Sequence, residues 1–245
     1  MVLVGDAHEH GRELFEQWFG ASSPAAESTP LAKRPSKAKA GASAKVDRDI
    51  YQFKITLDGI RPPIWRRIQL PSDATFWDLH CAINDAMGWE DAHLHAFRIG
   101  GRRDEVEIGV PMEDDAPWSL VETKAGWEVP IAKHFDKKGA RCTYIYDFGD
   151  DWVHRVVLEK ILPFDAKARY PRCVAGARAC PPEDCGGVPG YLALCTALAN
   201  PADADEHGQD LLEWIGEDYD PEPFDPAKVK FHSAARRLKA LRSQI

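Results

Sequence analysis

The sequence lacks several features that would place it in a class of protein. No apolar run approaches the roughly 18 residues that cross a bilayer, and the start lacks the basic and apolar regions of a secretory leader. We therefore expect a cytoplasmic protein without a membrane partner. A nucleophilic serine elbow, a phosphate-binding glycine loop and a His-Glu-x-x-His zinc helix are also missing, so the sequence does not support an enzyme.

Cysteine is sparse, and an overall positive charge is absent. Six cysteines in 245 residues are too few for a disulfide framework, so we expect thiols or metal ligands. The formal net charge of −8 argues against a globally basic nucleic-acid binder. Residues 203–225 hold ten acidic residues, and residues 227–245 hold six Lys or Arg. This polarity indicates an acidic region packed beside a basic final helix, with a phosphate-binding tail as the alternative.

The composition divides the chain into three parts. Glu9–Phe19 has apolar residues at helical spacing, which predicts a short amphipathic helix within residues 1–20. Residues 21–47 are mostly Ala, Ser, Pro and Lys, a composition typical of a flexible linker. Residues 48–245 contain most of the large apolar side chains and are predicted to form one domain.

Within this domain, strands precede helices. Period-two alternation predicts strands at 51–57 and 64–70, and further strands are expected at 95–99, 142–148 and 152–161. The residues between Thr75 and Gly88 carry the N-cap, apolar face and stop of a helix, and further helices are expected at 190–198, 206–215 and 226–241. Residues 104–129 read as a variable excursion. This order predicts an α+β, roll-like domain with a mixed or antiparallel sheet and C-terminal helices.

A loop rich in proline and glycine, residues 169–191, contains three of the six cysteines. Thiolates suit zinc, and a histidine on an adjacent strand would complete four ligands, so we predict a zinc site formed by Cys173, Cys180, Cys185 and His154. His93 and His95 are reserve ligands. The competing interpretation is that these are small packed thiols, with Glu183 and Asp184 capping backbone amides.

The segment Tyr144–His154 places three aspartates, a tryptophan and a histidine around a glycine turn. Carboxylates beside an imidazole can bind a hard cation or act as acid and base, whereas turn capping alone also explains them. With the cysteine loop, the segment predicts a binding surface of Asp147, Asp150, Asp151, Trp152, Glu183 and Asp184. A separate basic cluster includes Arg66 and Arg67, which strand alternation places on opposite faces.

These motifs resemble those of the plasmid-Ri open-reading-frame-three-like family. The resemblance spans roughly residues 49–231 and is carried by YQFKITLDGIRPPIWRRIQLP, HLHAFRIGG, YIYDFGDDWVHRVVLEKIL, RYPRCVAGARACPPEDCGGVPGY and LLEWIGEDYDPEPFD. It implies a compact α+β domain of plasmids, mobile elements and chromosomes, and no particular reaction. Some members are labelled resolvase-like, but the serines before the domain lie in the low-complexity linker, where no recombinase nucleophile is expected.

Three hypotheses for function follow from these patterns. The first is a non-enzymatic binding or accessory domain of plasmid or mobile-element type, with a protein or nucleic-acid partner and zinc as its one candidate cofactor. The second is a metal-dependent hydrolase or nuclease that uses Asp147, Asp150, Asp151 and His154. The third is a nucleic-acid-binding protein that uses the linker lysines and the final helix.

Overall fold

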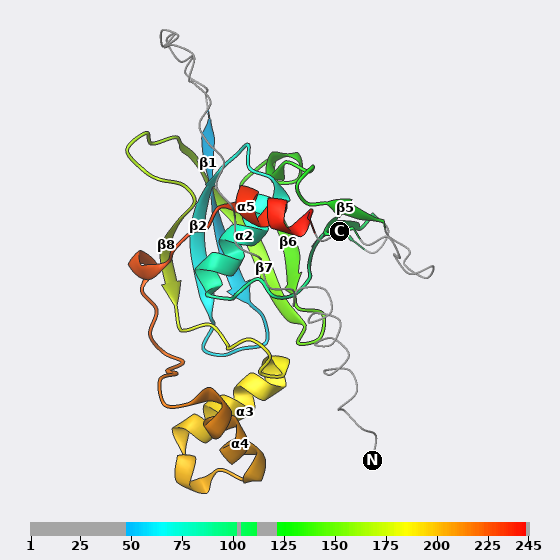
Figure 1. Cartoon of the computed structure of the whole chain (residues 1–245). Helices are drawn as coiled ribbons and strands as arrows, with labels where there is room; N and C mark the ends of the chain where they lie inside the picture. Colours follow the sequence, from blue (N-terminus) through cyan, green and yellow to red (C-terminus); the bar gives the residue numbers. More distant parts are fainter. Residues whose placement is uncertain (1–47, 102–103, 112–121, 244–245) are drawn as a thin grey trace, which may run out of the picture. The chain divides into compact units, whose positions relative to one another are not determined.

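The computed structural model describes residues 48–101, 104–111 and 122–243 (Figure 1). The predicted helix at Glu9–Phe19 and the linker after it lie outside these residues. None of the helices in the described ranges combines the length and the apolarity that a bilayer-crossing segment requires.

One mixed sheet contains all eight strands of the described residues (Figure 1). Their order is β5-β4-β3-β6-β7-β1-β2-β8, and neighbours are antiparallel except for the parallel pair β4 and β5. The strands are β1 (Asp49–Leu57), β2 (Trp65–Pro71), β3 (His95–Ile99), β4 (Val106–Gly109), β5 (Thr123–Ala125), β6 (Arg141–Tyr146), β7 (Trp152–Pro163) and β8 (Arg172–Ala177).

One α-helix lies between β2 and β3, and the others follow the sheet in the described chain. They are α2 (Phe76–Met87), α3 (Gly187–Ala199), α4 (Glu206–Ile215) and α5 (Ala234–Leu241), with short 3-10 turns at Ile131–Lys133, Pro201–Asp203 and Pro226–Lys228. The prediction of an α+β fold with a mixed sheet and C-terminal helices is confirmed.

The predicted final helix at 226–241 was too long. The α-helix covers only Ala234–Leu241, and Ser233 caps its first turn by accepting from the backbone N–H of Arg236. The extended residues before Ser233 instead pack Val229 and Phe231 against the core.

Helix α2 begins and ends at the residues that the sequence indicates. The Thr75 side chain accepts from the Asp78 backbone N–H, and the Asp78 carboxylate accepts from the Thr75 backbone N–H, which makes a capping box. Gly88 ends the helix with a φ of 107°, a conformation that only glycine adopts without strain. This stop sets the direction in which the next loop, residues 88–94, leaves the helix.

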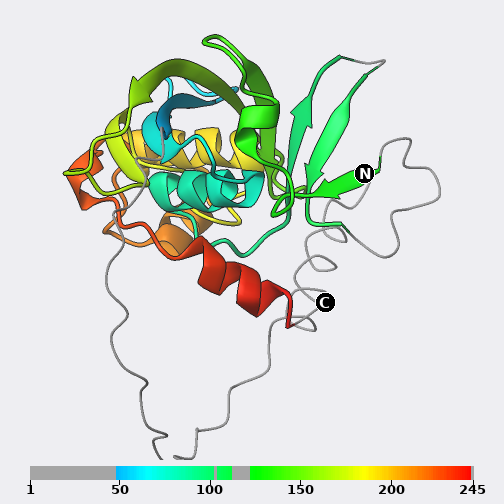
Figure 2. The same cartoon turned by 90° about the horizontal axis from the view of Figure 1, so that it is seen from above.

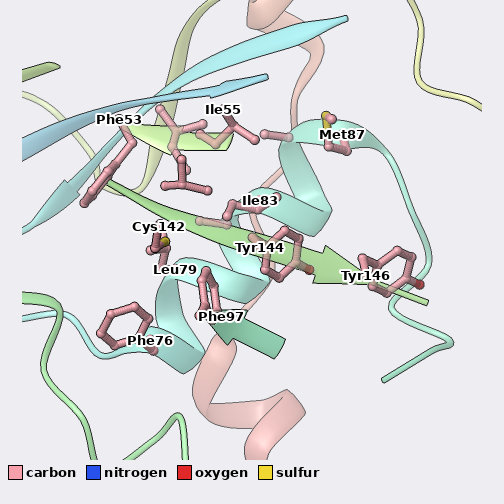
Figure 3. Close-up of a cluster of buried hydrophobic side chains, with 14 of the residues drawn as sticks. Phe53, Ile55, Phe76, Leu79, Ile83, Met87, Phe97, Cys142, Tyr144 and Tyr146 are labelled. Atoms are coloured by element: carbon pink, nitrogen blue, oxygen red, sulfur yellow. The ribbon is translucent and has the colours of Figure 1, made fainter. Parts of the chain in front are cut away.

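The inner face of the sheet holds the main core, and α2 packs on it (Figure 3). Phe76 of α2 meets Phe97 of β3 edge to face, with ring centroids 5.0 Å apart. Tyr144 packs on the other side of Phe97, with centroids 4.7 Å apart. Aromatic rings of α2, β3 and β6 thus form one contiguous part of the core.

Strand register separates this inner face from an outer one, because cross-strand partners share a face. Tyr144, His154 and Leu57 are partners across β6, β7 and β1, and each is at most 1% exposed. Arg155, the next residue of β7, is exposed on the opposite side. Helices α2 and α5 lie on the inner side in both views, and no helix of the described chain covers the outer face (Figures 1 and 2).

Arg66 is buried on the inner side, opposite to its half-buried neighbour Arg67, as strand alternation requires. It is 1% exposed and donates from Nε to the Ala86 carbonyl, 2.7 Å away. Its Nη1 donates to the carbonyls of Trp65 and Ala177 at 2.9 and 3.0 Å. The Phe224 ring lies 3.6 Å from the guanidinium carbon. Arg66 thus ties β2 to the end of α2 and to β8.

Two segments predicted to be irregular contain strands. Residues 172–177, in the cysteine loop, pair with β2 as the edge strand β8. Residues 106–109 and 123–125 form β4 and β5, which extend the sheet at its other edge. The predictions were wrong because short edge strands obtain their hydrogen bonds from a neighbouring strand and need no alternation of their own.

Candidate functional site

Three loops of the described chain meet at one group of titratable side chains. Residues 88–94 supply His93, the turn between β6 and β7 supplies Asp147, and the segment between β8 and α3 supplies Glu183 and Asp184. We call these four residues the three-loop site. They come from segments up to 91 positions apart in the chain, counted from His93 to Asp184.

His93 is at the centre of the three-loop site. Its Nε2 atom lies 3.1 Å from Asp184 Oδ1, 3.6 Å from Asp147 Oδ2 and 3.8 Å from Glu183 Oε2. One ligand atom from each of His93, Asp147 and Asp184 lies within 4.8 Å of the other two. The side chains of Asp147 and Asp184 are 10% and 61% exposed, so the site is closed beneath and open to solvent at Asp184.

Trp89 joins the first loop to the other two. Its Nε1 donates to the Pro181 carbonyl at 3.0 Å, and its ring stacks on Tyr146 with centroids 4.8 Å apart. Trp89 is 4% exposed, so this link lies within the core. The relative positions of the loops are therefore set by packing and not by the carboxylates alone.

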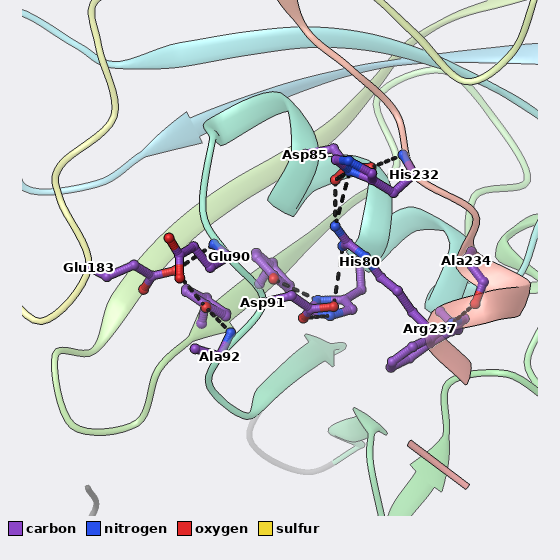
Figure 4. A network of polar contacts seen from close by, with 12 residues as sticks. His80, Asp85, Glu90, Asp91, Ala92, Glu183, His232, Ala234 and Arg237 are labelled. Atoms are coloured by element: carbon purple, nitrogen blue, oxygen red, sulfur yellow. Dashed lines mark hydrogen bonds and ion pairs between the residues drawn. The ribbon is translucent and has the colours of Figure 1, made fainter. Parts of the chain in front are cut away.

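Glu183 is held by donors from the other loops (Figure 4). Its Oε1 accepts from the Glu90 backbone N–H at 2.8 Å and from the Tyr146 hydroxyl at 3.0 Å. The Tyr146 oxygen in turn accepts from the Ala92 backbone N–H at 3.0 Å. Burial raises the pKa of Glu183, and the bonds from Glu90 and Tyr146 oppose that rise.

Four aspartates in these loops have a positive φ, and one of them is Asp151, with a φ of 52°. Asp91, Asp147 and Asp184 have φ values of 64°, 56° and 55°, in the left-handed region that few residues other than glycine adopt. Asp147 Oδ1 accepts from the Gly149 backbone N–H at 2.8 Å, a local bond that stabilises its turn. Such conformations often occur at functional sites, where surrounding structure enforces them.

A second polar network lies behind the first loop (Figure 4). His80 Nε2 lies 2.7 Å from Asp91 Oδ1, to which it donates because a carboxylate only accepts, and His80 Nδ1 shares a hydrogen bond with the Tyr144 hydroxyl at 2.9 Å. His95 stacks on His80 with ring centroids 3.4 Å apart, and burial holds the pKa of His95 well below its usual value.

Arg237 of α5 connects this network to the C-terminal segment. It donates to Asp91 Oδ2 at 3.2 Å and to Asp85 Oδ1 at 2.6 Å. Asp85 also accepts from the backbone N–H of His232 at 2.8 Å. Helix α5 thereby restrains the loop that carries His93.

Three of the six residues predicted for the binding surface meet at the three-loop site. Asp147, Glu183 and Asp184 belong to the three-loop site. Asp150 is 7% exposed and accepts from the Gly186 backbone N–H at 3.2 Å, which ties the turn to the start of α3. Asp151 is exposed beside them, and Trp152 is fully buried in the core.

The residues predicted for zinc do not form one of the two groups in the described chain whose ligand atoms lie within 4.8 Å of one another. His154 is fully buried between the rings of Trp89 and Tyr144, and burial lowers its pKa to about 3. Burial raises the pKa of Cys185 to about 12 and also raises those of Cys173 and Cys180. The zinc hypothesis stays a prediction, and the geometry favours the other ligand set.

His154 predicts a component of acid sensitivity. Its pKa of about 3 lies below the ordinary 6.5, so the unfolded chain takes up a proton that the folded chain refuses. The contribution of neutral His154 to the free energy of unfolding is expected to be fully present above pH 6.5. As the pH falls from 6.5 to 3, the free energy of unfolding should decrease by up to about 1.4 kcal/mol per pH unit. Urea unfolding across this window should show a shallower dependence in His154→Gln. The same slope of unfolding free energy against pH in the wild type and in His154→Gln would contradict the prediction. The control is His207→Gln, because His207 is exposed on α4.

His93 and His95, the two reserve zinc ligands, lie in different surroundings. His93 precedes β3 and faces the carboxylates, whereas His95 lies within β3 and is buried against His80. The sequence feature that could have indicated this role is the position of His93, two residues before a strand and five residues after Gly88, which ends α2.

Comparison with known proteins identifies relatives across most of the chain. The model of the family described as plasmid pRiA4b ORF-3-like protein matches residues 49–228. The uncharacterized protein y4hQ of Sinorhizobium fredii (strain NBRC 101917 / NGR234) is 36% identical over 175 residues, which cover 70% of this chain and 84% of that protein.

A solved structure shares both fold and sequence. The crystal structure of the protein of unknown function MM3350 from Methanosarcina mazei Go1 has a TM-score of 0.66 and 40% identity, and the match covers 77% of this chain and 100% of that one. Sequence and structure agree: the chain belongs to the plasmid pRiA4b ORF-3-like family.

Proposed function

We propose that the protein is a binding domain whose three-loop site holds a divalent cation. The observation that carries the proposal is the approach of His93 Nε2 to carboxylate oxygens of Asp147 and Asp184, at 3.6 and 3.1 Å. Two ligand atoms that each lie about 2.1 Å from an ion are at most about 4.2 Å apart, so these separations suit a shared cation with little movement.

The ligand types narrow the choice of ion. One imidazole and two or three carboxylates suit Zn²⁺ or Mn²⁺ better than Ca²⁺, which prefers oxygen ligands alone. Glu183 is positioned to contribute as a further ligand, because the Glu90 N–H and the Tyr146 hydroxyl bond its Oε1, whereas its Oε2 faces His93.

Removing a ligand should abolish tight binding. We expect His93→Ala and Asp147→Asn each to weaken Mn²⁺ and Zn²⁺ binding by at least about 100-fold, measured by titration calorimetry on the full chain. Asp151→Asn is the matched control, because Asp151 is an exposed aspartate with positive φ in the same turn. It should bind like the wild type.

Two results would contradict the proposal. One is wild-type affinity in both ligand variants. The other is loss of zinc from Cys180→Ser while His93→Ala retains it, which would support the cysteine set instead. Circular dichroism of each variant separates loss of a ligand from loss of the fold.

Hydrolysis assisted by the cation is a second candidate function. It is favoured by the exposure of Asp184, which leaves the solvent side of the site open to a metal-bound water. In this hydrolase hypothesis His93 takes the place of His154, because His154 is fully buried. Cation-dependent turnover of a phosphodiester that disappears in Asp147→Asn, and persists in Asp151→Asn, would support it. Binding without turnover would support the binding domain alone.

A further inference from the structure

The outer face of the sheet carries positive charge, although the chain as a whole has a formal net charge of −8. Cross-strand pairing places two adjacent rows of residues on this face, each crossing β6, β7, β1 and β2. We call them the outer rows; the first is Arg141, Val157, Lys54 and Arg67, and the second is Thr143, Arg155, Thr56 and Trp65. Four of these eight residues are cationic and none is acidic.

The cations of the outer rows are accessible. Arg141 and Arg155 are exposed, and Lys54 is half-buried with its Nζ 5.2 Å from the centre of the Trp65 ring. Arg155 has an ion pair with Asp58 at 2.7 Å, and both side chains are well exposed. An exposed pair of this kind contributes little to stability, so a bound anion can compete with Asp58 for Arg155.

Arg67 has a different role. It donates from Nη2 to Glu159 Oε1 at 2.9 Å and also contacts Glu159 through Nε, and its guanidinium lies 5.0 Å from the centre of the Trp65 ring. Glu159 therefore compensates Arg67 and fixes it beside the tryptophan. The positive charge that the rows offer to a ligand is concentrated on Lys54 and Arg141, with Arg155 next to them.

We propose that the outer rows bind single-stranded nucleic acid. Adjacent strands are about 4.8 Å apart, so a row across four strands spans about 14 Å and places cations along a line that a flexible phosphate backbone can follow. The half-buried Trp65 supplies a ring for base stacking, and the threonine hydroxyls supply phosphate donors.

The observations favour a single strand over other polyanions. Reading a duplex requires an element that enters a groove, and no helix of the described chain lies on this face. An acidic peptide would use the cations but would not need the tryptophan. The outer rows consist of strand residues, whereas the three-loop site is formed by loops, so chelation of cations should not affect this binding.

The test measures fluorescence anisotropy of a labelled oligothymidylate of about 15 nucleotides against the full chain, in chelator and over a range of salt concentrations. The variant Lys54→Gln/Arg141→Gln/Arg155→Gln should bind at least about tenfold more weakly near 0.1 M salt. Its salt slope should be shallower by about 2, because each phosphate that a cation neutralises on a single strand contributes about 0.7 to the slope. Trp65→Leu should weaken binding about fivefold or more with an unchanged salt slope.

The matched control removes the same number of positive charges from a different place, the basic helix α5 and its C-terminal end. Arg236→Gln/Lys239→Gln/Arg242→Gln alters three exposed cations and should leave affinity and salt slope unchanged. The proposal is overturned if this control loses binding while the outer-row variant keeps it. It is also overturned if the wild type does not bind at about 50 mM salt, or if polyglutamate competes as well as oligothymidylate.

Discussion

Arg66→Ala is expected to lower the free energy of unfolding by about 3–5 kcal/mol, with urea denaturation followed by circular dichroism as the measurement. The guanidinium is 1% exposed, and its three hydrogen bonds all go to backbone carbonyls. Alanine would leave those acceptors without a donor and would open a cavity under Phe224. Both effects act on the junction of α2, β2 and β8.

Arg67→Ala is the matched control for this prediction. The two arginines are adjacent on β2, but the side chain of Arg67 is 29% exposed and pairs with Glu159 on the outer face. We expect a loss of about 1 kcal/mol or less. Arg66→Met separates volume from hydrogen bonding, because it refills most of the space and still leaves the carbonyls unpaired. A loss below about 1 kcal/mol in Arg66→Ala would show that the buried guanidinium is not a structural link.

Gly187→Ala is expected to destabilise the fold by about 2–5 kcal/mol. Gly187 begins α3 with a φ of 65°, where an L-residue is strained. A Cβ atom there would also overlap the backbone carbonyl oxygen of Asp150 in the turn between β6 and β7. The turn would have to move away from α3, so cation affinity at the three-loop site should fall together with stability.

Gly139→Ala is the control that separates the effect of the steric contact with Asp150 from the effect of the positive φ. Gly139 has a φ of 88°, but a Cβ atom there meets nothing within 4 Å. It should therefore lose only the conformational cost of about 1–2 kcal/mol and should retain cation affinity. Equal losses in the two variants would show that the close approach of Gly187 to Asp150 is unimportant.

Much of the fold could be predicted because its central elements carry local signals. The sequences of β1 and β2 alternate apolar and polar residues over much of their length, and α2 has a capping box and a glycine stop. The edge strands β5 and β8, and the short strand β4 next to β5, have no such pattern, since a neighbouring strand determines whether they form. The same reasoning explains the final helix, where contacts of Phe231 with the core prevailed over helical periodicity.

The sequence indicated the carboxylates of the candidate site but not its histidine. Asp147, Glu183 and Asp184 stand in recognisable loops, but nothing local indicates that the loop after α2 crosses them and brings His93 to their oxygens. The prediction of His154 as a zinc ligand did not take into account that side chains alternate between the two faces of a strand. Trp152, His154 and Val156 share one face of β7, and all three are fully buried.

Strand β7 should be the last part of the sheet to open. This twelve-residue strand is paired along both sides, with β6 and β1, whereas β5 and β8 are edge strands of the described sheet. Local unfolding begins where few backbone bonds must break, so fluctuations should start at the two edges and reach β7 last. The turn that carries Asp147 connects β6 directly to β7, and its geometry should therefore persist through partial openings of the sheet.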